Sequence, residues 1–245
     1  MIKKSALILI SALTLNSLIA SANPSPHWSY EGDDGPEHWA TLSADYTSCG
    51  SGLNQSPLNL TEMIAADQIP LVLNYHPGGK EILNNGHTVQ VNYAAGNTLN
   101  VGFRSFNLIQ FHFHTPAENR IEGKSYPMAM HLVHATPEGR LAVLAIMFQA
   151  GEENKELAKV WGDLPLPGEK KELDNGLDIS KLLPESLDYI QYNGSLTTPP
   201  CTEGVSWFVL KTPIEASADQ IAAFTRLIGE NSRPIQPLNA RVVIQ

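Results

Sequence analysis

Two histidines, His112 and His114, stand two residues apart in the aromatic run Gln110–His114. The run predicts a β-strand, in which side chains at i and i+2 point to the same face, so both imidazoles project together and the phenylalanines of the run point the other way. His131 follows 17 residues later in a second strand-like run. Three imidazoles on two strands, with a fourth coordination position left open, make up the ligand set of a catalytic zinc ion.

The elements that must position these histidines are mostly strands. Alternating, β-branched and aromatic runs predict strands over 71–75, 88–93, 108–114, 129–134, 141–148, 205–210 and 241–244. Helices are expected at 154–160 and 217–228, the latter capped by Ser217, and the aromatic segment 27–39 is expected to be an irregular arm. No internal repeat or linker interrupts the chain, so we expect a single, mostly β domain of the α+β class with short surface helices.

The N-terminal residues have the pattern of a targeting segment. Lys3 and Lys4 precede an apolar run over 6–15, and Ala20-Ser21-Ala22 resembles a cleavage site. We therefore predict a signal peptide over 1–22, a mature domain over 23–245, and a periplasmic or secreted protein. The apolar run is too short for a membrane anchor, and the net charge of −9 without basic clusters argues against nucleic-acid binding.

The chain contains two cysteines, Cys49 and Cys201. In an oxidising compartment the simplest expectation is one disulfide between them. The alternative that the residues leave open is a catalytic cysteine.

Three segments together resemble the α-class carbonic anhydrases of the bacterial, exported type. They are Gln110–His114, 131–134 (His-Leu-Val-His) and 194–201 (Gly-Ser-Leu-Thr-Thr-Pro-Pro-Cys), and further similar segments lie at 28–30, 35–39 and 231–237. The resemblance implies one large, twisted, mainly antiparallel sheet that carries Zn²⁺ in a conical cleft. It also implies reversible hydration of carbon dioxide to bicarbonate and a proton through a zinc-bound hydroxide, inhibition by sulfonamides and anions, and a homodimer.

The resemblance also assigns roles to individual residues. His112, His114 and His131 are implied as zinc ligands, Glu118 and Thr197 as the pair that orients the hydroxide, and His87 as the proton shuttle. The implied carbon dioxide pocket consists of Val133, Val143, Leu196, Thr197, Thr198 and Trp207. The implied polar residues of the cleft are Tyr30, Asn85 and Gln90, and Gln110 is implied as the partner of one zinc histidine.

Two positions depart from the family pattern. Ala129 stands where the family usually has a glutamate that supports the third zinc histidine, and Asn119 stands where a histidine that partners this glutamate is common. Loss of such a supporting group predicts weaker zinc retention and reduced turnover. The functional alternative is a weakened or non-catalytic zinc protein of carbonic anhydrase type.

Two unrelated kinds of metal site share part of this histidine pattern. A zinc protease is disfavoured because His131 and His134 form H-x-x-H without the catalytic glutamate. The spacing from His112 through His114 to Glu118 resembles the first motif of a cupin-type metalloenzyme, but the matching second histidine-bearing hairpin is missing. A cupin would use Glu118 as a ligand with iron or manganese, whereas the favoured interpretation does not.

Overall fold

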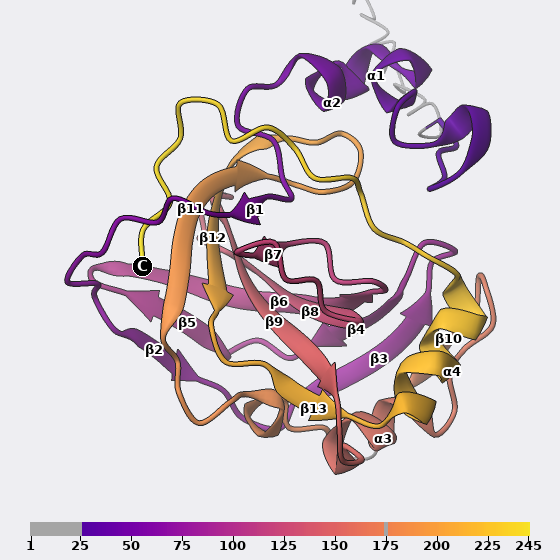
Figure 1. The fold of residues 1–245 in the computed structure, drawn as a ribbon. Helices are drawn as coiled ribbons and strands as arrows, with labels where there is room; N and C mark the ends of the chain where they lie inside the picture. The colour runs from indigo at the N-terminus through magenta and orange to yellow at the C-terminus, as the bar shows by residue number, and fades with distance from the viewer. Residues whose placement is uncertain (1–25, 174–175) are drawn as a thin grey trace, which may run out of the picture.

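One large sheet dominates the computed structural model, which describes residues 26–173 and 176–245 (Figure 1). The expected signal peptide lies outside these residues. Within them, eleven strands form the main sheet: β2 (Leu71–Asn74), β3 (Gly79–Asn84), β4 (Val89–Tyr93), β5 (Thr98–Val101), β6 (Arg104–His114), β8 (Met128–Ala135), β9 (Leu141–Ala150), β10 (Lys170–Glu172), β11 (Tyr189–Ser195), β12 (Glu203–Leu210) and β13 (Ile214–Ala216).

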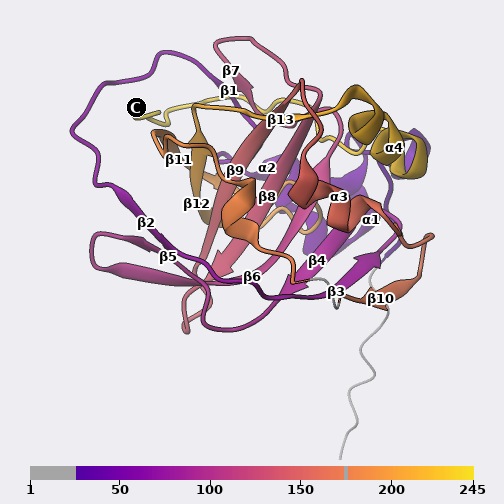
Figure 2. The ribbon, with the colours of Figure 1, turned by 90° about the horizontal axis from the view of Figure 1, so that it is seen from below.

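The central path of this sheet runs in the order β10-β3-β4-β6-β8-β9-β12-β11. Within the whole sheet, neighbouring strands are antiparallel except that β12 and β13 run parallel to β9, and β13 lies off the central path. A separate parallel pair, β1 (Asn59–Leu60) and β7 (Arg120–Ile121), lies over one face of the sheet (Figures 1 and 2). The expected fold, mostly β with a large, mainly antiparallel sheet, is therefore confirmed.

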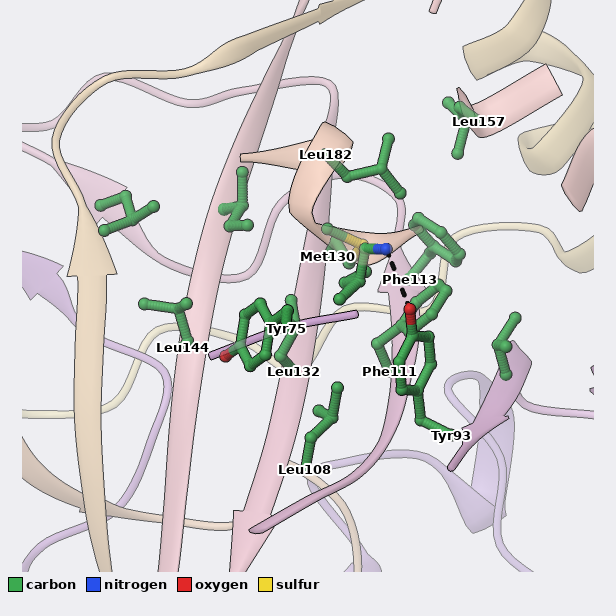
Figure 3. Packing of buried hydrophobic residues seen from close by; sticks show 14 of the residues in the cluster. Tyr75, Tyr93, Leu108, Phe111, Phe113, Met130, Leu132, Leu144, Leu157 and Leu182 are labelled. Carbon is green, nitrogen blue, oxygen red and sulfur yellow. Dashed lines mark hydrogen bonds between the residues drawn. The ribbon is translucent and has the colours of Figure 1, made fainter. Parts of the chain in front are cut away.

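One face of the sheet is packed with apolar side chains and covered by helices. Phe111 and Phe113 of β6 belong to this core, which confirms that they point away from the histidines between them. Figure 3 shows the packing and the hydrogen bond that the Ile179 N–H donates to the Tyr93 hydroxyl, at 3.0 Å. The helices on this face are α3 (Lys155–Trp161), α4 (Ala218–Ile228) and a 3-10 turn over Ile179–Leu182.

The opposite face holds a second apolar cluster, and the β1–β7 pair lies over it. This cluster brings together residues of β8, β9, β11 and β12 with Leu58 and Leu60 from the segment around β1. The candidate site lies on this face, because His112 and His114 alternate with the phenylalanines of the first core along β6.

The segment 27–39, expected to be irregular, contains one 3-10 turn over Gly32–Asp34 and ends where α1 (Trp39–Leu42) begins. A second 3-10 turn over Ala44–Tyr46 and α2 (Ser48–Ser51) follow it. Trp39 and Tyr46 pack in a small cluster around the Cys49–Cys201 disulfide, which links residues 152 positions apart. The predicted disulfide is thus present, and it anchors this segment to the loop before β12.

Both predicted helices occur, each with a polar cap: Asn154 for α3, and Ser217 with a reciprocal bond from Gln220 for α4. The predicted strand over 241–244 is wrong. Of these residues only Ile244 forms β-bridges, which are isolated ones to Ile64 and Gln191. The Arg241 side chain donates to the carbonyls of Leu238 and Pro237. In the described ranges, no helix has the length and apolarity needed to cross a membrane.

Candidate metal centre

The three candidate ligands come together through the pairing of β6 with β8. The antiparallel register places His112 directly opposite His131, and His114 opposite Ala129. Because directly paired residues share a face, all three imidazoles gather on the side of the sheet that carries the second cluster. One nitrogen from each ring lies within 4.8 Å of the others, which is the only such group of metal-binding side chains among the described residues.

Hydrogen bonds orient the two histidines of β6. His112 Nδ1 lies 2.9 Å from the Gln110 side-chain oxygen, and His114 Nδ1 lies 2.7 Å from the Asn231 carbonyl oxygen. Each acceptor requires a proton on Nδ1, so the lone pair of Nε2 remains available to a metal. These contacts set both the tautomer and the direction of the two rings.

His131 presents a different ring nitrogen. Its Nδ1 is 3.8 Å from Glu118 Oε2, and His114 Nε2 is 3.5 Å from the same oxygen, so the two nitrogens face a common point. His131 Nε2 therefore points away from this centre, and it has no hydrogen-bond partner among the described residues. The third candidate ligand is oriented by packing, including the edge of its ring against Trp207 at 5.0 Å between centroids.

The electrostatics favour neutral imidazoles. Burial lowers the pKa of His112 and of His131 well below the usual histidine value, and the neighbouring His114 acts in the same direction. Only a neutral imidazole has a lone pair for a metal ion. The buried His114 Nε2 also lacks a hydrogen-bond partner. Three nitrogen donors around one point with an unsatisfied nitrogen fit a transition-metal ion.

Glu118 closes one side of the centre and is almost completely buried. Its Oε1 accepts a hydrogen bond from the Arg233 backbone N–H at 2.9 Å. Burial raises the pKa of Glu118, while His114, the Arg233 N–H and the hydroxyl of Thr197 act in the opposite direction. The structure thus brings Glu118 and Thr197 together beside the histidines, as the resemblance implies.

A buried network holds the segment that carries Thr197. Cys201 is bonded to Cys49, and its carbonyl accepts from the Gln55 amide at 3.0 Å. The Arg233 guanidinium donates to the carbonyl of Cys49 and to the Gln55 side chain, both at 2.8 Å. Burial lowers the pKa of Arg233 to about 10, so this side chain is still a cation at neutral pH.

The residues of the expected apolar pocket form one row across the sheet. Val133 of β8 pairs with Val143 of β9, which pairs with Trp207 of β12. This row is two positions along from the row that holds His112 and His131, so it lies beside the candidate metal on the same face. Leu196 packs against the same cluster. Together these residues make an apolar wall next to the metal centre.

The expected polar residues of the cleft occupy varied surroundings. His87 is half-buried and stacks on Trp28, with ring centroids 3.7 Å apart, and burial lowers its pKa. The Asn85 side chain accepts from the N–H groups of His87 and Thr88 and therefore stabilises its own turn. Gln90 lies directly opposite His112 across the β4–β6 pair. Burial, followed by the charge of Glu118, raises the pKa of Tyr30.

The two departures from the family pattern are visible in the structure. Ala129 is fully buried among apolar residues of the second cluster. Asn119 Oδ1 accepts from the Leu58 N–H at 2.9 Å and the Tyr192 hydroxyl at 3.1 Å, and Asn119 Nδ2 has no partner among the described residues. Neither position 129 nor position 119 therefore provides a side-chain acceptor for His131 Nε2 in the described structure.

Sequence reasoning assigned no role to Asn231 or Arg233. Asn231 holds His114 through its carbonyl, and its side chain bonds the Thr115 N–H and the carbonyls of His87 and Phe113. These partners are more than 100 positions away along the chain. The resemblance of the segment 231–237 to the family was the one signal in the sequence for these two residues. A backbone carbonyl is present in every residue type, so the sequence cannot show which carbonyl binds His114.

Comparison with known proteins agrees with this geometry. The model of the eukaryotic-type carbonic anhydrase family matches residues 34–245. A carbonic anhydrase of Neisseria gonorrhoeae is 47% identical over 97% of this chain and 95% of its own length, and one of Pectobacterium atrosepticum is 48% identical over 92% and 93%.

A solved structure is equally similar. The α-carbonic anhydrase of Thermovibrio ammonificans in complex with the inhibitor sulfanilamide superposes with a TM-score of 0.89 and 45% identity, over 91% of this chain and all of that one. These matches favour neither the cupin nor the non-catalytic alternative. The chain therefore belongs to the α-class, or eukaryotic-type, carbonic anhydrases, the enzymes that interconvert carbon dioxide and bicarbonate.

Proposed function

We propose that this enzyme binds Zn²⁺ through His112 Nε2, His114 Nε2 and His131 Nδ1, and that it hydrates carbon dioxide reversibly at this centre. The observation that carries the proposal is the convergence of three histidine nitrogens within 4.8 Å beside an apolar wall. Three neutral nitrogen ligands with one open position are the arrangement of catalytic zinc sites. When bound there, zinc lowers the pKa of a coordinated water, for which carbonic anhydrase itself is the reference case.

Glu118 and Thr197 are proposed to orient the nucleophile. The Arg233 N–H occupies Glu118 Oε1, so Oε2 is free to accept the proton of the Thr197 hydroxyl. A hydroxyl whose proton is committed to a carboxylate offers only its lone pairs to a third group. The Thr197 oxygen therefore accepts a hydrogen bond from the nucleophile, which turns the nucleophile's own lone pair toward the substrate.

The apolar row is proposed to receive carbon dioxide. Val133, Val143 and Trp207 present no free polar group to the cleft, since the Trp207 indole N–H is used by the Ser195 carbonyl at 3.0 Å. Carbon dioxide is small and apolar, so such a wall holds it without competing hydrogen bonds. Leu196, Thr197 and Thr198 are proposed to complete the substrate site from the loop before β12.

His87 is proposed to carry the product proton to solvent, with Tyr30, Asn85 and Gln90 ordering water along the path. Its ring is half-buried against Trp28, and its lowered pKa keeps it available as an acceptor at neutral pH. His87→Ala is expected to slow turnover roughly 100-fold in dilute buffer. Imidazole added to the assay should restore most of the rate, and a rate independent of imidazole would exclude this role.

We also propose that residues 1–22 direct export and that the mature protein acts in the periplasm or outside the cell. The disulfide supports this, because disulfides persist in oxidising compartments. N-terminal sequencing of protein from the periplasmic fraction should begin at Asn23. Size-exclusion chromatography with light scattering should give the mass of a homodimer.

Metal analysis combined with stopped-flow carbon dioxide hydration tests the central proposal. We expect one zinc per chain and hydration that an aromatic sulfonamide abolishes, in keeping with the sulfanilamide complex of the relative. Zinc without hydration activity would contradict catalysis at this centre. Purified protein that holds iron or manganese in place of zinc would contradict the proposed metal.

A further inference from the structure

Two buried side-chain N–H donors outside the metal centre have no hydrogen-bond partner among the described residues. Of the five unsatisfied buried side-chain atoms among the described residues, His114 Nε2 and Glu118 Oε2 face the metal position, and Arg233 Nε belongs to a guanidinium that already makes three hydrogen bonds. The remaining two are Asn119 Nδ2 and His131 Nε2. A buried donor without an acceptor costs roughly 1–3 kcal/mol, so such atoms normally have a partner.

Both donors reach the same apolar cluster. The Tyr192 hydroxyl donates to Asn119 Oδ1, the Tyr192 ring stacks on Trp207 at 5.7 Å, and Trp207 packs edge-on against His131 at 5.0 Å. The Leu58 N–H also donates to Asn119 Oδ1, which fixes the amide so that Nδ2 points to the other side. Asn119 and His131 therefore both contact residues of this cluster, Asn119 through Tyr192 and His131 through Trp207.

Ala129 offers no polar side chain to either donor. It precedes His131 by two residues on β8, so the two side chains share a face, and it packs in the cluster that contains Tyr192 and Trp207. Ala129 pairs with Met147 of β9, which is also apolar and fully buried. The surroundings thus offer two N–H donors, apolar walls and no acceptor.

We propose that a small hydrogen-bond acceptor, either a water molecule or a small anion such as a halide or formate, is bound beside Ala129 between His131 Nε2 and Asn119 Nδ2. The inference rests on the proposed function, in which His131 binds the metal through Nδ1 and keeps its proton on Nε2. An acceptor is required because both groups at this position donate. The occupant must be small, because Ala129, Met147, Asn119 and His131 are all almost completely buried.

This site would make the orientation of a metal ligand depend on an exchangeable molecule. Gln110 and Asn231 are part of the chain and support their histidines through direct hydrogen bonds, whereas His131 would be supported by a molecule taken from the solvent. An ordered bridging molecule replaces a direct hydrogen bond at little enthalpic cost but can leave. The strength with which His131 binds the metal would then depend on the composition of the solution.

Crystals of the zinc-loaded enzyme saturated with an aromatic sulfonamide test this, because the sulfonamide fills the open metal position and keeps anions from it. Crystals grown without halide are soaked in bromide, and anomalous scattering is measured. A bromide peak about 3.3 Å from both nitrogens supports the anion, since bromide is larger than the oxygen acceptors of ordinary hydrogen bonds. An ordered density about 2.9 Å from both nitrogens that bromide does not displace supports water.

Absence of density between the two nitrogens, or a protein acceptor in that place, would overturn the proposal. Zinc content is measured on the same crystals, so that a failure of the metal assignment is distinguished from a failure of this inference. Asn119→Asp is the matched control, since it keeps an acceptor for the Leu58 N–H and removes one donor from the site. The bromide peak should disappear in this variant while zinc and sulfonamide remain bound.

Discussion

Strands β6 and β8 each contribute histidines to the metal centre, but they hold them in different ways. On β6, both imidazoles donate to acceptors at less than 3 Å, one from the Gln110 side chain and one from the Asn231 backbone. On β8, none of the described residues accepts from His131 Nε2, the nitrogen that points away from the metal position, and Ala129 stands two residues before it. Ligand count and ligand support are therefore separate properties of this site.

The difference teaches that packing alone can place an imidazole. His131 is enclosed by its strand partner His112 and by the ring of Trp207, and these contacts bring Nδ1 to the common centre. Packing does not, however, select a tautomer, because an apolar contact does not distinguish a protonated nitrogen from a bare one. We expect β6 to supply the stable part of the site and β8 the labile part.

The largest effect is expected when a ligand is removed from either strand. His114→Ala and His131→Ala should each lose zinc and reduce hydration to the background rate, because a histidine nitrogen is removed from a three-nitrogen site. Metal analysis by mass spectrometry and stopped-flow assays measure both. His134→Gln, a change at another buried histidine of β8, should keep its zinc. If His131→Ala bound zinc normally, the site would need only β6.

His134 is a buried histidine whose two ring nitrogens both have hydrogen-bond partners, and its contribution to the free energy of unfolding can be measured. His134 contacts the Tyr75 hydroxyl at 2.7 Å and the Leu132 carbonyl at 2.9 Å, and burial lowers its pKa to about 4. The unfolded chain therefore takes up a proton first as the pH falls below about 6.5, so this histidine alone lowers the free energy of unfolding by about 3 kcal/mol by pH 4.

Urea unfolding of the metal-free protein and of His134→Gln between pH 7.5 and 4.5 measures this contribution. The wild type should lose stability more steeply with falling pH than the variant, with no difference in slope above pH 7. The metal-free form is used because zinc release would add its own pH dependence. Parallel curves would show that His134 does not titrate in the expected range.

On β6, the hydrogen bond that orients His112 can be removed without changing a metal ligand. Gln110→Ala deletes the acceptor for His112 Nδ1 and should weaken zinc affinity by roughly 10- to 100-fold. Competition with a chelator of known affinity gives the constant. Gln110→Glu keeps an acceptor at the same place and should retain most of the affinity. An unchanged affinity in Gln110→Ala would mean that packing holds His112 as it holds His131.

On β8, a hydrogen-bond acceptor for His131 can be added. Ala129→Glu supplies a carboxylate to His131 Nε2 and should slow zinc dissociation roughly tenfold, at the lower end of the effect of such groups. The rate of zinc transfer to a chelator in excess is the measurement. Ala129→Met fills the same space without an acceptor and should show no such slowing. Equal dissociation rates for wild type and Ala129→Glu would contradict the idea that β8 is the weak side.

Much of this arrangement follows from local pattern. The alternation of histidine and phenylalanine along β6 specifies which residues face the metal and which face the core, and the caps at Asn154 and Ser217 mark both longer helices. Strand β11 was not predicted, although Tyr189, Ile190 and Tyr192 are residue types that favour strands.

The rest depends on contacts between distant segments. The false strand over 241–244 shows the limit, since its residues include β-branched ones but only Ile244 finds bridge partners, in the distant segments at Ile64 and Gln191. The same holds for Asn231, whose carbonyl binds His114 from 117 positions away. Backbone acceptors cannot be read from residue type, so this part of the site required the structure.

The contacts of Asn231 and Arg233 also set an order of assembly during synthesis. The histidines of β6 and β8 are made long before these residues, which supply the acceptor for His114 and a donor for Glu118. A nascent chain that ends before them has all three histidines but lacks those two contacts. Since domains fold as units once their segments are available, zinc loading should be complete only after this late segment has reached the same compartment and docked.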